Sequence, residues 1–427
     1  MVPLLRERGI RSKLTPQRAV LVGVRGMRMS MSRMQHSLDE LASLVDTAGG
    51  IVVGLTSQEV KRIDSSTYLG RGKVDEIAHL VEEGAADLVV VDAELSPVQN
   101  RNLEDRVGAL VLDRSAVILD IFAKRARSSE GKLQVELAQL QYLAPRLVGR
   151  GKIFSQQAGR IGTRGPGETA LEYDRRRIRE RITLLRRSLE RVRAHRDLHR
   201  RKRASVPIPM ISLVGYTNAG KSTLMNSLTD ASVFVEDKLF ATLDPTVRRL
   251  RLPSGREVLL ADTVGFISRL PHELIEAFKS TFEEVASSQL LLHVIDGSDE
   301  EASVKIKVVE NVLEELDLSG KSRVDVINKS DIAGPIYNGD ADSVKVSALT
   351  GEGMEKILEK LDTMLLTEFV HVSLLMPHER GDIVSDLYKV AHVNSVSYND
   401  DGIRVECELH AKQYGKYRKY VEHRNMK

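Results

Sequence analysis

The chain has few of the features that mark secreted, membrane-spanning or disulfide-stapled proteins. Cys407 is its one cysteine among 427 residues, which excludes an internal disulfide and a cysteine-based zinc site and fits a reducing cytoplasm. No stretch approaches the roughly 18 uncharged apolar residues of a transmembrane helix. Charges from Arg6 onward leave no apolar segment of signal-peptide length. We therefore expect a cytoplasmic protein without a membrane span.

The composition is that of a folded, water-soluble protein. Hydrophobic residues make up 42% and charged residues 29%, which excludes a disordered tail protein or a collagen-like fibre. At about 150 residues per domain, the length predicts two to four domains. We predict an N-terminal α/β unit (1–128), a basic antiparallel helical hairpin (129–203), a central α/β unit (204–367) and a small C-terminal α+β unit (368–427).

Strand and helix patterns alternate along residues 19–127. Apolar runs at 19–24, 51–56, 88–93 and 109–113 predict strands, and helical patterns lie at 36–45 and 74–83. This alternation predicts a parallel sheet with both faces covered. The tetrapeptide Gly70-Arg71-Gly72-Lys73 could bind a second phosphate, but four residues carry little information. We favour a tight turn that opens the second helix, with phosphate binding as the alternative.

The net charge of +3 hides a strongly basic segment. Residues 128–205 contain 20 Lys and Arg against 8 Asp and Glu, a net charge of +12, so the rest of the chain sums to −9. Apolar residues at alternating spacings of four and three predict two helices packed as a hairpin. They are Leu133, Leu137, Leu140, Ala144 and Leu147 on the first, and Ile178, Ile182, Leu185, Leu189 and Val192 on the second.

The loop between these helices is rich in glycine and in cations. Residues 149–167 hold six glycines together with Arg150, Lys152, Arg160 and Arg164, and no acid precedes Glu168. An adaptable cationic backbone suits a phosphate surface, so RNA is the first candidate partner. The alternative is that these charges form only a solvated helical surface and bind no partner.

A glycine-rich segment between a strand and a helix is the strongest functional signal. Gly215, Gly220, Lys221 and Ser222 satisfy the phosphate-loop pattern, after an apolar strand at 211–214 and before a helical pattern at 222–228. Backbone N–H groups of such a turn face a triphosphate. Lys221 would bridge the β- and γ-phosphates, and Ser222 would give its hydroxyl to Mg²⁺.

Three further motifs follow later predicted strands. The first would bind Mg²⁺ through Asp262 and the γ-phosphate through the N–H of Gly265. The other two, Asn328 to Asp331 and Ser347–Ala348, would bind the base. The Asp331 carboxylate can take both the N1–H and the exocyclic amine of guanine, a donor pair that adenine lacks. Because all four motifs lie at the carboxyl ends of predicted strands, they converge on one crevice. The sequence therefore predicts a guanine nucleotide as ligand, in a P-loop GTPase domain with a mostly parallel sheet flanked by helices.

These motifs resemble those of the translation-factor-related GTPases and, within them, the HflX family. The segments 240–246 (FATLDPT) and 262–278 (DTVGFISRLPHELIEAF) look like the two switch segments of that family. Residues 67–77, 136–149 and 165–178 look like its N-terminal region. The resemblance covers nearly all of the chain up to about residue 365 and is weak beyond it.

The resemblance implies a full set of site residues. Lys221, Thr242 and Gly265 would be catalytic, and Ser222 and Thr242 would hold Mg²⁺, although Thr246 is an equal candidate for the metal. Asn218 matches relatives that hold K⁺ beside the phosphates, a hypothesis that equal GTPase rates in K⁺ and Na⁺ would contradict. GTP would contact Gly215, Tyr216, Thr217, Asn218, Ala219, Gly220, Lys221, Ser222, Thr223, Phe240, Ala241, Thr242, Leu243, Asp244, Asp262, Thr263, Val264, Gly265, Asn328, Lys329, Ser330, Asp331, Ser347, Ala348 and Leu349.

The resemblance also implies partners. It points to a monomeric GTPase that binds the large ribosomal subunit and its rRNA and splits or rescues stalled ribosomes under stress. Phe266 stands where Ras-like enzymes carry a water-orienting glutamine, so we expect slow intrinsic hydrolysis that a partner stimulates. Two alternatives stay open. One is an ATP-dependent RNA-remodelling protein with a regulatory GTPase domain, and the other is a non-ribosomal signalling GTPase, peripherally attached to an anionic membrane or bound to a protein.

The last sixty residues show a pattern of their own. Alternation at 370–376 predicts a strand, followed by a helix at 378–390 and a hairpin that turns at 399–402. Tyr414, Tyr417 and Tyr420 lie three apart among Lys and Arg. Such tyrosines can stack on RNA bases, but we favour packing on the small sheet because helical periodicity is the commoner cause.

Overall fold

The computed structural model describes residues 16–27, 29–146, 170–203, 208–229, 238–269, 282–332, 337–366 and 369–422. The glycine-rich loop and the end of the second switch segment lie outside these residues. The chain forms two compact units: Met1–Val192 with Glu236–Asp244 and Ile267–Thr281, and Arg193–Val235 with Pro245–Phe266 and Phe282–Lys427. The division into four domains stays a prediction.

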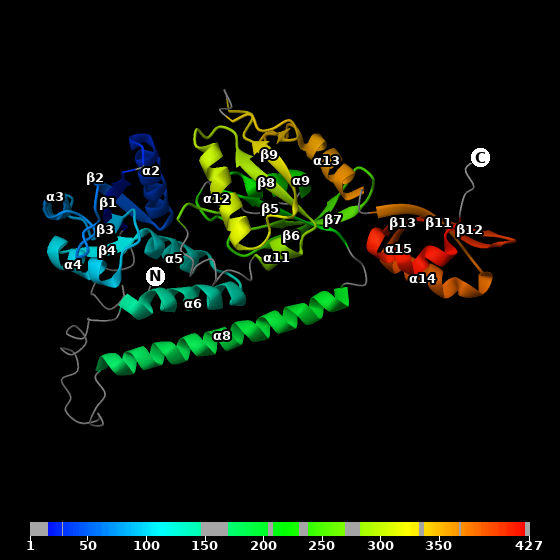
Figure 1. Ribbon diagram of the computed structural model, residues 1–427, viewed down its shortest axis with the longest axis horizontal. Coiled ribbons are helices and arrows are strands. Elements are labelled where there is room, and N and C mark those ends of the chain that lie inside the picture. Colours follow the sequence, from blue (N-terminus) through cyan, green and yellow to red (C-terminus); the bar gives the residue numbers. More distant parts are fainter. Residues whose placement is uncertain are drawn as a thin grey trace. The chain divides into compact units, whose positions relative to one another are not determined.

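The first unit contains the expected parallel sheet (Figure 1). Its strands are β1 (Gln17–Gly26), β2 (Gly50–Val60), β3 (Leu88–Val91) and β4 (Leu110–Asp113), in the order β2-β1-β3-β4, with every pairing parallel. Helices α3 (Arg71–Glu83) and α4 (Pro97–Val107) pack on one face, where valines of β1 and β3 form the core. Helix α2 (Met31–Thr47) packs on the face of Gly23, and α5 (Arg114–Arg125) lies against α2 and β4.

Local sequence signals explain where these helices begin. Ser96 caps α4 in a reciprocal pair with Gln99, with Pro97 as the first helical residue. Gly70 precedes α3 in an extended conformation, and the helix begins at Arg71, so Arg71, Gly72 and Lys73 form its first turn, earlier than the predicted start at Val74. The Lys73 ammonium contacts the Glu76 carboxylate at 2.6 Å and the Thr56 hydroxyl at 3.1 Å. Within the described residues, that lysine is thus paired with an acid of its own helix.

The two helices of the predicted hairpin belong to the first unit as far as Val192. Helix α6 spans Ser129–Arg146 and α8 spans Ala170–Arg203. Leu137, Leu185 and Leu189 form a buried cluster, with Leu133, Leu140 and Ile182 packed against it, which confirms the predicted apolar seam. Arg181 of α8 donates two hydrogen bonds to Glu136 of α6, at 2.7 and 2.9 Å. Leu147 of the predicted seam lies outside the described residues.

The second unit contains a six-stranded sheet. Its strands are β5 (Met210–Gly215), β6 (Thr246–Arg251), β7 (Glu257–Asp262), β8 (Leu290–Asp296), β9 (Ser322–Asn328) and β10 (Val344–Lys345). The order is β10-β9-β8-β5-β7-β6, and β6 alone among these strands runs antiparallel to its neighbour. Helices α9 (Lys221–Thr229), α11 (Glu283–Ser287), α12 (Ala302–Glu315) and α13 (Met354–Leu366) flank it. This is the expected mostly parallel sheet of a P-loop domain.

The C-terminal part forms a small antiparallel sheet with helices on one face. Strands β11 (Phe369–Met376), β12 (Ala391–Asn399) and β13 (Gly402–His410) have the order β11-β13-β12, and α14 (Gly381–Val390) and α15 (Ala411–Tyr417) accompany them, with short 3₁₀ turns at His378–Arg380 and Arg418–Tyr420. Tyr417 is buried, and Tyr414 and Tyr420 pack against the same core, so the packing role of the tyrosine stripe is confirmed. Burial raises the pKa of the Cys407 thiol to about 11, which leaves it unreactive.

A buried ion network holds the carboxyl end of the first sheet. Asp92 follows β3 and is 1% exposed, and Arg114 at the start of α5 is 2% exposed. The Arg114 guanidinium pairs with Asp92 at 3.1 Å and with Glu40 of α2. Ser37 donates a further hydrogen bond to Asp92 at 2.5 Å. The arginine thus joins three elements of this unit.

We predict that Arg114→Met destabilises the first unit strongly. The substitution removes the cation that Asp92 and Glu40 share. Arg269 still contacts Asp92 at 3.1 Å, so the cost lies below that of a fully uncompensated buried charge, at about 1–3 kcal/mol. Hydrogen exchange of the β1 and β3 amides should accelerate accordingly. Arg101→Met is the control, because that arginine is half exposed and its ion pair with Asp105 is long, 3.8 Å. Equal exchange rates in both variants would contradict the prediction.

Candidate nucleotide-binding site

The phosphate loop joins β5 to α9 through backbone conformations that favour glycine. Gly215 has φ +152° and Gly220 has φ +90°. A Cβ atom would lie 2.3 Å from the Val294 carbonyl oxygen at the first position and 2.2 Å from the Asn328 amide at the second. Neither glycine can therefore carry a side chain, and the turn leaves room for a ligand close to its backbone. Asn218 has φ +60° and an exposed side chain.

The side chain of Lys221 folds back over this turn. Its ammonium donates to the carbonyl oxygens of Gly215 at 3.0 Å and Tyr216 at 2.7 Å. Burial lowers the pKa of Lys221 to about 8, because a desolvated ammonium loses the favourable hydration of its charge. A Cβ atom on Gly265 would lie 2.9 Å from this nitrogen, so the second switch segment begins beside the lysine. An anion in the turn would restore the proton affinity that burial removes.

The predicted magnesium residues of the second unit lie together. The Ser222 hydroxyl donates to Asp262 Oδ2 at 2.6 Å, and Asp262 is fully buried at the end of β7. A hydroxyl and a carboxylate are the hard oxygen ligands that Mg²⁺ prefers, so this pair fits the ion. Thr246 begins β6 directly opposite Asp262 in the sheet register, whereas Thr242 belongs to the first unit. Both threonines remain candidates for the metal.

The second switch segment is tied to the phosphate loop by its backbone. The Thr217 N–H donates to the Phe266 carbonyl at 2.7 Å, and the Phe266 N–H donates to the Gly215 carbonyl at 3.1 Å. The Phe266 ring is 2% exposed and stacks on Phe282, with ring centroids 5.5 Å apart. This residue is therefore part of the core, and its side chain offers no hydrogen bond to a water molecule.

The base-binding motifs converge on the same loop. Asn328 Nδ2 donates to the Ala219 carbonyl at 2.9 Å, and Asn328 Oδ1 accepts from the Ala348 N–H at 2.9 Å. One buried amide thus joins the phosphate loop to both base-binding segments. Lys329, with φ +63°, pairs with Asp296 at 2.6 Å. Ser347 is fully buried, and its hydroxyl accepts from the Thr350 N–H at 3.1 Å, while Asp331 and Leu349 are exposed.

The predicted first-switch residues have other partners, in the first unit. Phe240 is buried and meets Phe122 of α5 edge-on, with centroids 4.7 Å apart. The Asp244 carboxylate accepts from the backbone N–H groups of Arg127 at 2.8 Å and Ser128 at 2.7 Å. It therefore caps the start of α6, a role that the sequence analysis did not anticipate. Its role as a nucleotide contact stays a prediction.

Sequence reasoning also missed Arg269 of the second switch segment. This residue has φ +54°, and its guanidinium donates to the Asp92 carbonyl at 2.8 Å and to its carboxylate at 3.1 Å. The two residues are 177 positions apart. No local pattern joins them, although Asp92 directly follows an apolar strand, the position where the other motif acids were found.

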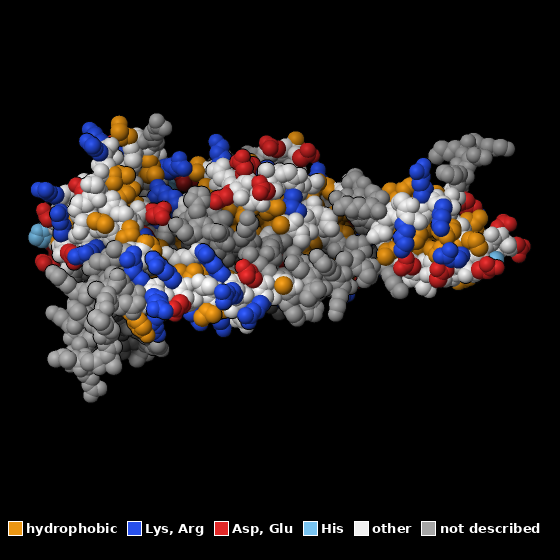
Figure 2. Space-filling view, turned by 60° about the horizontal axis from the view of Figure 1, so that its bottom comes forward, with side chains coloured by type: hydrophobic (Ala, Val, Ile, Leu, Met, Phe, Trp, Pro, Cys, Tyr) orange, Lys and Arg blue, Asp and Glu red, His pale blue; other side chains and the backbone are white. Residues whose placement is uncertain are grey.

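The hairpin presents a basic surface. Figure 2 shows blue side chains gathered along the helices at the lower face of the molecule. Two exposed acids of α8, Glu180 and Glu190, accompany a larger set of exposed arginines on that helix: Arg176, Arg177, Arg179, Arg181, Arg186, Arg187 and Arg191. No helix of the described residues is both long and apolar enough to cross a membrane.

Four family models match consecutive parts of the chain. They are the GTP-binding GTPase N-terminal model over residues 35–123, the GTP-binding GTPase Middle Region over 125–203, the 50S ribosome-binding GTPase over 210–329 and the HflX C-terminal domain over 337–421. The last match extends the likeness into the C-terminal unit, where the sequence resemblance was weak.

Whole-length relatives agree with these models. The GTPase HflX of Caldanaerobacter subterraneus is 49% identical over 393 residues, which are 92% of this chain and 91% of that protein. The GTPase HflX of Escherichia coli is 42% identical over 90% of this chain and 92% of its own. A solved structure of a GTP-binding protein from Sulfolobus solfataricus with GDP is 26% identical over 81% of this chain and 98% of that chain, with a TM-score of 0.43. The sequence identity to the two GTPase HflX relatives and the family models show that the chain belongs to the HflX family of GTPases, as its motifs predicted.

Proposed function

We propose that this GTPase binds the large ribosomal subunit through the basic hairpin and acts on stalled ribosomes under stress. The observation that carries the proposal is the Asp244 carboxylate, a first-switch group that binds the backbone of the two residues directly before α6. If the conformation of this segment changed with the bound nucleotide, the change would alter its contact with the start of the hairpin directly. The exposed arginines of α8 and the ribosome-binding model matched by residues 210–329 support the same partner.

The proposed chemistry is in-line attack of water on the γ-phosphate. Lys221 and the N–H groups of the phosphate loop would stabilise the charge that develops on the phosphoryl oxygens. Mg²⁺, held through Ser222 and Asp262, would neutralise the β- and γ-phosphate oxygens when bound. Because Phe266 is packed in the core, another group must orient the water, and hydrolysis by the isolated protein would be slow. A K⁺ ion beside Asn218 remains a prediction.

Base specificity tests the assignment of the guanine pocket. Asp331→Asn should weaken GTP binding by about 10- to 100-fold and favour xanthosine triphosphate, because a charge-assisted hydrogen bond contributes about 1.5–3 kcal/mol. Calorimetric titration with both nucleotides measures the change. Asp340→Asn changes another exposed acid and should leave both affinities unaltered. An unchanged preference in the Asp331 variant would mean that the pocket is misassigned.

Proton linkage tests the role of Lys221. With a pKa of about 8 in the free protein and a proton that a bound triphosphate would hold, GTP binding should take up about half a proton near pH 8 and close to one near pH 9. GTP affinity should then fall as pH rises through this range. Calorimetry in buffers of different ionisation enthalpy measures the uptake. Lys221→Arg keeps its charge and should abolish it. Equal uptake by both proteins would place the titrating group elsewhere.

Ribosome dependence tests the partner. Large subunits should accelerate GTP hydrolysis, and reversing Arg150, Lys152, Arg160 and Arg164 to glutamate should remove most of this stimulation while GTP affinity stays constant. In a plot of the logarithm of ribosome affinity against the logarithm of salt concentration, the slope should become less steep by about one unit for each lost phosphate contact. The matched control reverses four cations outside the hairpin: Arg71, Arg101, Lys345 and Lys356.

Two results would contradict this proposal. If the GTP-bound protein stays in the supernatant at low salt, the ribosome is not its partner. If it instead sediments with anionic vesicles, that result would support a non-ribosomal GTPase attached to a membrane. Rapid hydrolysis by the isolated protein would show that the site is complete without a partner.

A further inference from the structure

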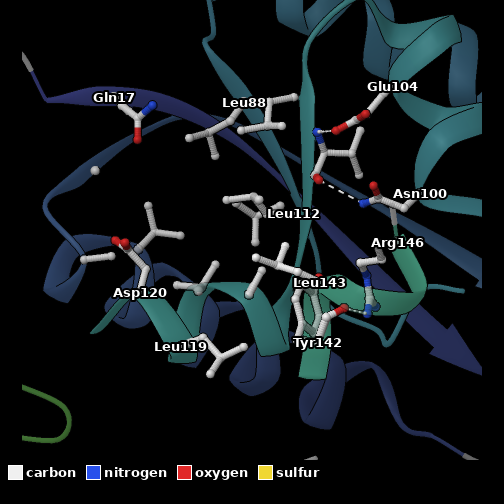
Figure 3. Close-up of a pocket in the computed structure, with 18 of the residues that line it drawn as sticks. Gln17, Leu88, Asn100, Glu104, Leu112, Leu119, Asp120, Tyr142, Leu143 and Arg146 are labelled. Carbon is white, nitrogen blue, oxygen red and sulfur yellow. Dashed lines mark hydrogen bonds between the residues drawn. The ribbon is translucent and has the colours of Figure 1, made fainter. Parts of the chain in front are cut away.

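Some buried polar side-chain atoms of the described residues have no hydrogen-bond partner. The Nε2 atoms of Gln17 and Gln139 line an apolar cavity of about 110 Å³ between strands β3 and β4 and helices α5 and α6 (Figure 3). The residues of the nucleotide motifs are absent from that lining. The hydroxyl oxygen of Thr217 is unpaired as well, and this residue lies in the phosphate loop itself. An unpaired hydroxyl at a reaction site is suited to bind substrate or water.

The side chain of Thr217 lies between the phosphate loop and the second switch segment. The residue is 7% exposed, and its backbone N–H donates to the Phe266 carbonyl at 2.7 Å. A Cβ atom on Gly265 would lie 3.0 Å from the Thr217 Cγ2 methyl group and 2.9 Å from the Lys221 ammonium. The methyl group therefore faces Gly265, and the hydroxyl group on the same carbon atom lies close by.

This place adjoins the two positions beside which the attacking water is expected. The Gly265 N–H is the predicted contact of the γ-phosphate, and Ras-like enzymes orient the water with a glutamine at the position of Phe266. Here the Phe266 ring stacks on Phe282 and contributes no polar group. Thr217 contacts both Gly265 and Phe266, so it brings a polar side chain to the same place.

The Lys221 ammonium lies beside the same glycine in the free protein. Its hydrogen bonds there go to the carbonyl oxygens of Gly215 and Tyr216. When the ammonium binds the phosphates instead, the space beside Gly265 opens to the γ-phosphate and to water. The Thr217 hydroxyl, which is buried and unpaired in the free protein, then acquires partners. A hydrogen bond that forms only with the substrate in place favours the reacting state.

A threonine hydroxyl can make both hydrogen bonds that this step needs. It has one donor hydrogen and two accepting lone pairs. It can accept from the attacking water and donate to a γ-phosphate oxygen, which turns a lone pair of the water toward phosphorus. As the water oxygen bonds to the γ-phosphorus, the bond to the β–γ bridging oxygen breaks and its electron pair goes to GDP. The water proton goes to a phosphate oxygen, and the hydroxyl keeps its own hydrogen.

We propose that the Thr217 hydroxyl orients the attacking water in GTP hydrolysis. This proposal rests on the proposed in-line attack at the phosphate loop and is independent of the ribosome. A neutral hydroxyl adds no positive charge to the site, so hydrolysis by the isolated protein stays slow. The contact is made with the reacting water and the γ-phosphate, and GDP lacks both.

Hydrolysis by the isolated full-length protein tests the hydroxyl. Thr217→Val replaces it by a methyl group, and the single-turnover rate should fall about tenfold, the factor that one ordinary hydrogen bond contributes. Affinity for GDP should stay constant, and Thr217→Ser should retain most of the rate. Thr229→Val is the matched control, because that hydroxyl donates to the Met225 carbonyl at 2.7 Å within α9. A wild-type rate in Thr217→Val would overturn the proposal.

GDP with aluminium fluoride tests the contact without turnover. The fluoride group and the water bound to it imitate the transferring phosphoryl group and the attacking water. Thr217→Val should weaken the binding of this pair by about the same tenfold, because the lost bond belongs to the transition state. Calorimetric titration measures the affinity. Equal affinities of the wild type and the variant would contradict the proposal.

Thermal unfolding separates this role from a structural one. Because the hydroxyl has no partner in the free protein, valine removes a buried unpaired polar group. Thr217→Val should therefore unfold at the same temperature as the wild type or at a higher one, while it hydrolyses GTP more slowly. A variant that is both slower and less stable would assign the hydroxyl a structural role and overturn the proposal.

The two proposals fail separately. Lys221→Ala should abolish GTP binding, because the lysine contacts the phosphates. If GTP binding survived in that variant, the phosphate loop would be misassigned and both proposals would fall. A wild-type rate in Thr217→Val, together with lost GTP binding in Lys221→Ala, removes the role of the hydroxyl alone.

Discussion

Two backbone hydrogen bonds hold the site together: Thr217 N–H to the Phe266 carbonyl and Phe266 N–H to the Gly215 carbonyl. They place Gly265 against the buried Lys221 ammonium, so the phosphate loop and the start of the predicted second switch segment lie side by side. Backbone bonds do not depend on side-chain chemistry, which is why phenylalanine is tolerated where other GTPases carry glutamine. Position 215 requires glycine for a separate reason, because a Cβ atom there would clash with the neighbouring strand.

Polar contacts accompany the apolar ones that hold the ends of the switch segments in the first unit. Asp244 accepts from the start of α6, and Arg269 donates to Asp92, a carboxylate already shared with Arg114. Charge-assisted hydrogen bonds depend steeply on distance and angle, so a displacement of about 1 Å breaks them, whereas an apolar contact such as that of Phe240 with Phe122 tolerates it. Contacts that break sharply are suited to segments that change with the nucleotide.

The fold and the motifs could be predicted because their signals are local. The apolar runs, the glycines of the phosphate loop and the acid after β7 each act within a few residues. The Asp244 cap and the Arg269–Asp92 contact could not, because their partners lie more than 100 residues away. The role of Asn328 was predicted only in part. We expected it to begin the base-binding motif, but its amide also forms hydrogen bonds to the phosphate loop and to Ala348. The cavity beneath α6 arises from side-chain packing and has no signature in one sequence.

The burial of Phe266 and of Lys221 has a common consequence. A phenylalanine stacked in the core adds to stability but gives the attacking water no hydrogen bond. The lysine is desolvated before the nucleotide binds, so its charge acts on the phosphates with little screening. Under the proposed function, a site with strong charge stabilisation and a phenylalanine at position 266 would bind the triphosphate well and hydrolyse it slowly. Its GTP-bound state would then last until a partner completes the site, so that the partner would set the moment of hydrolysis.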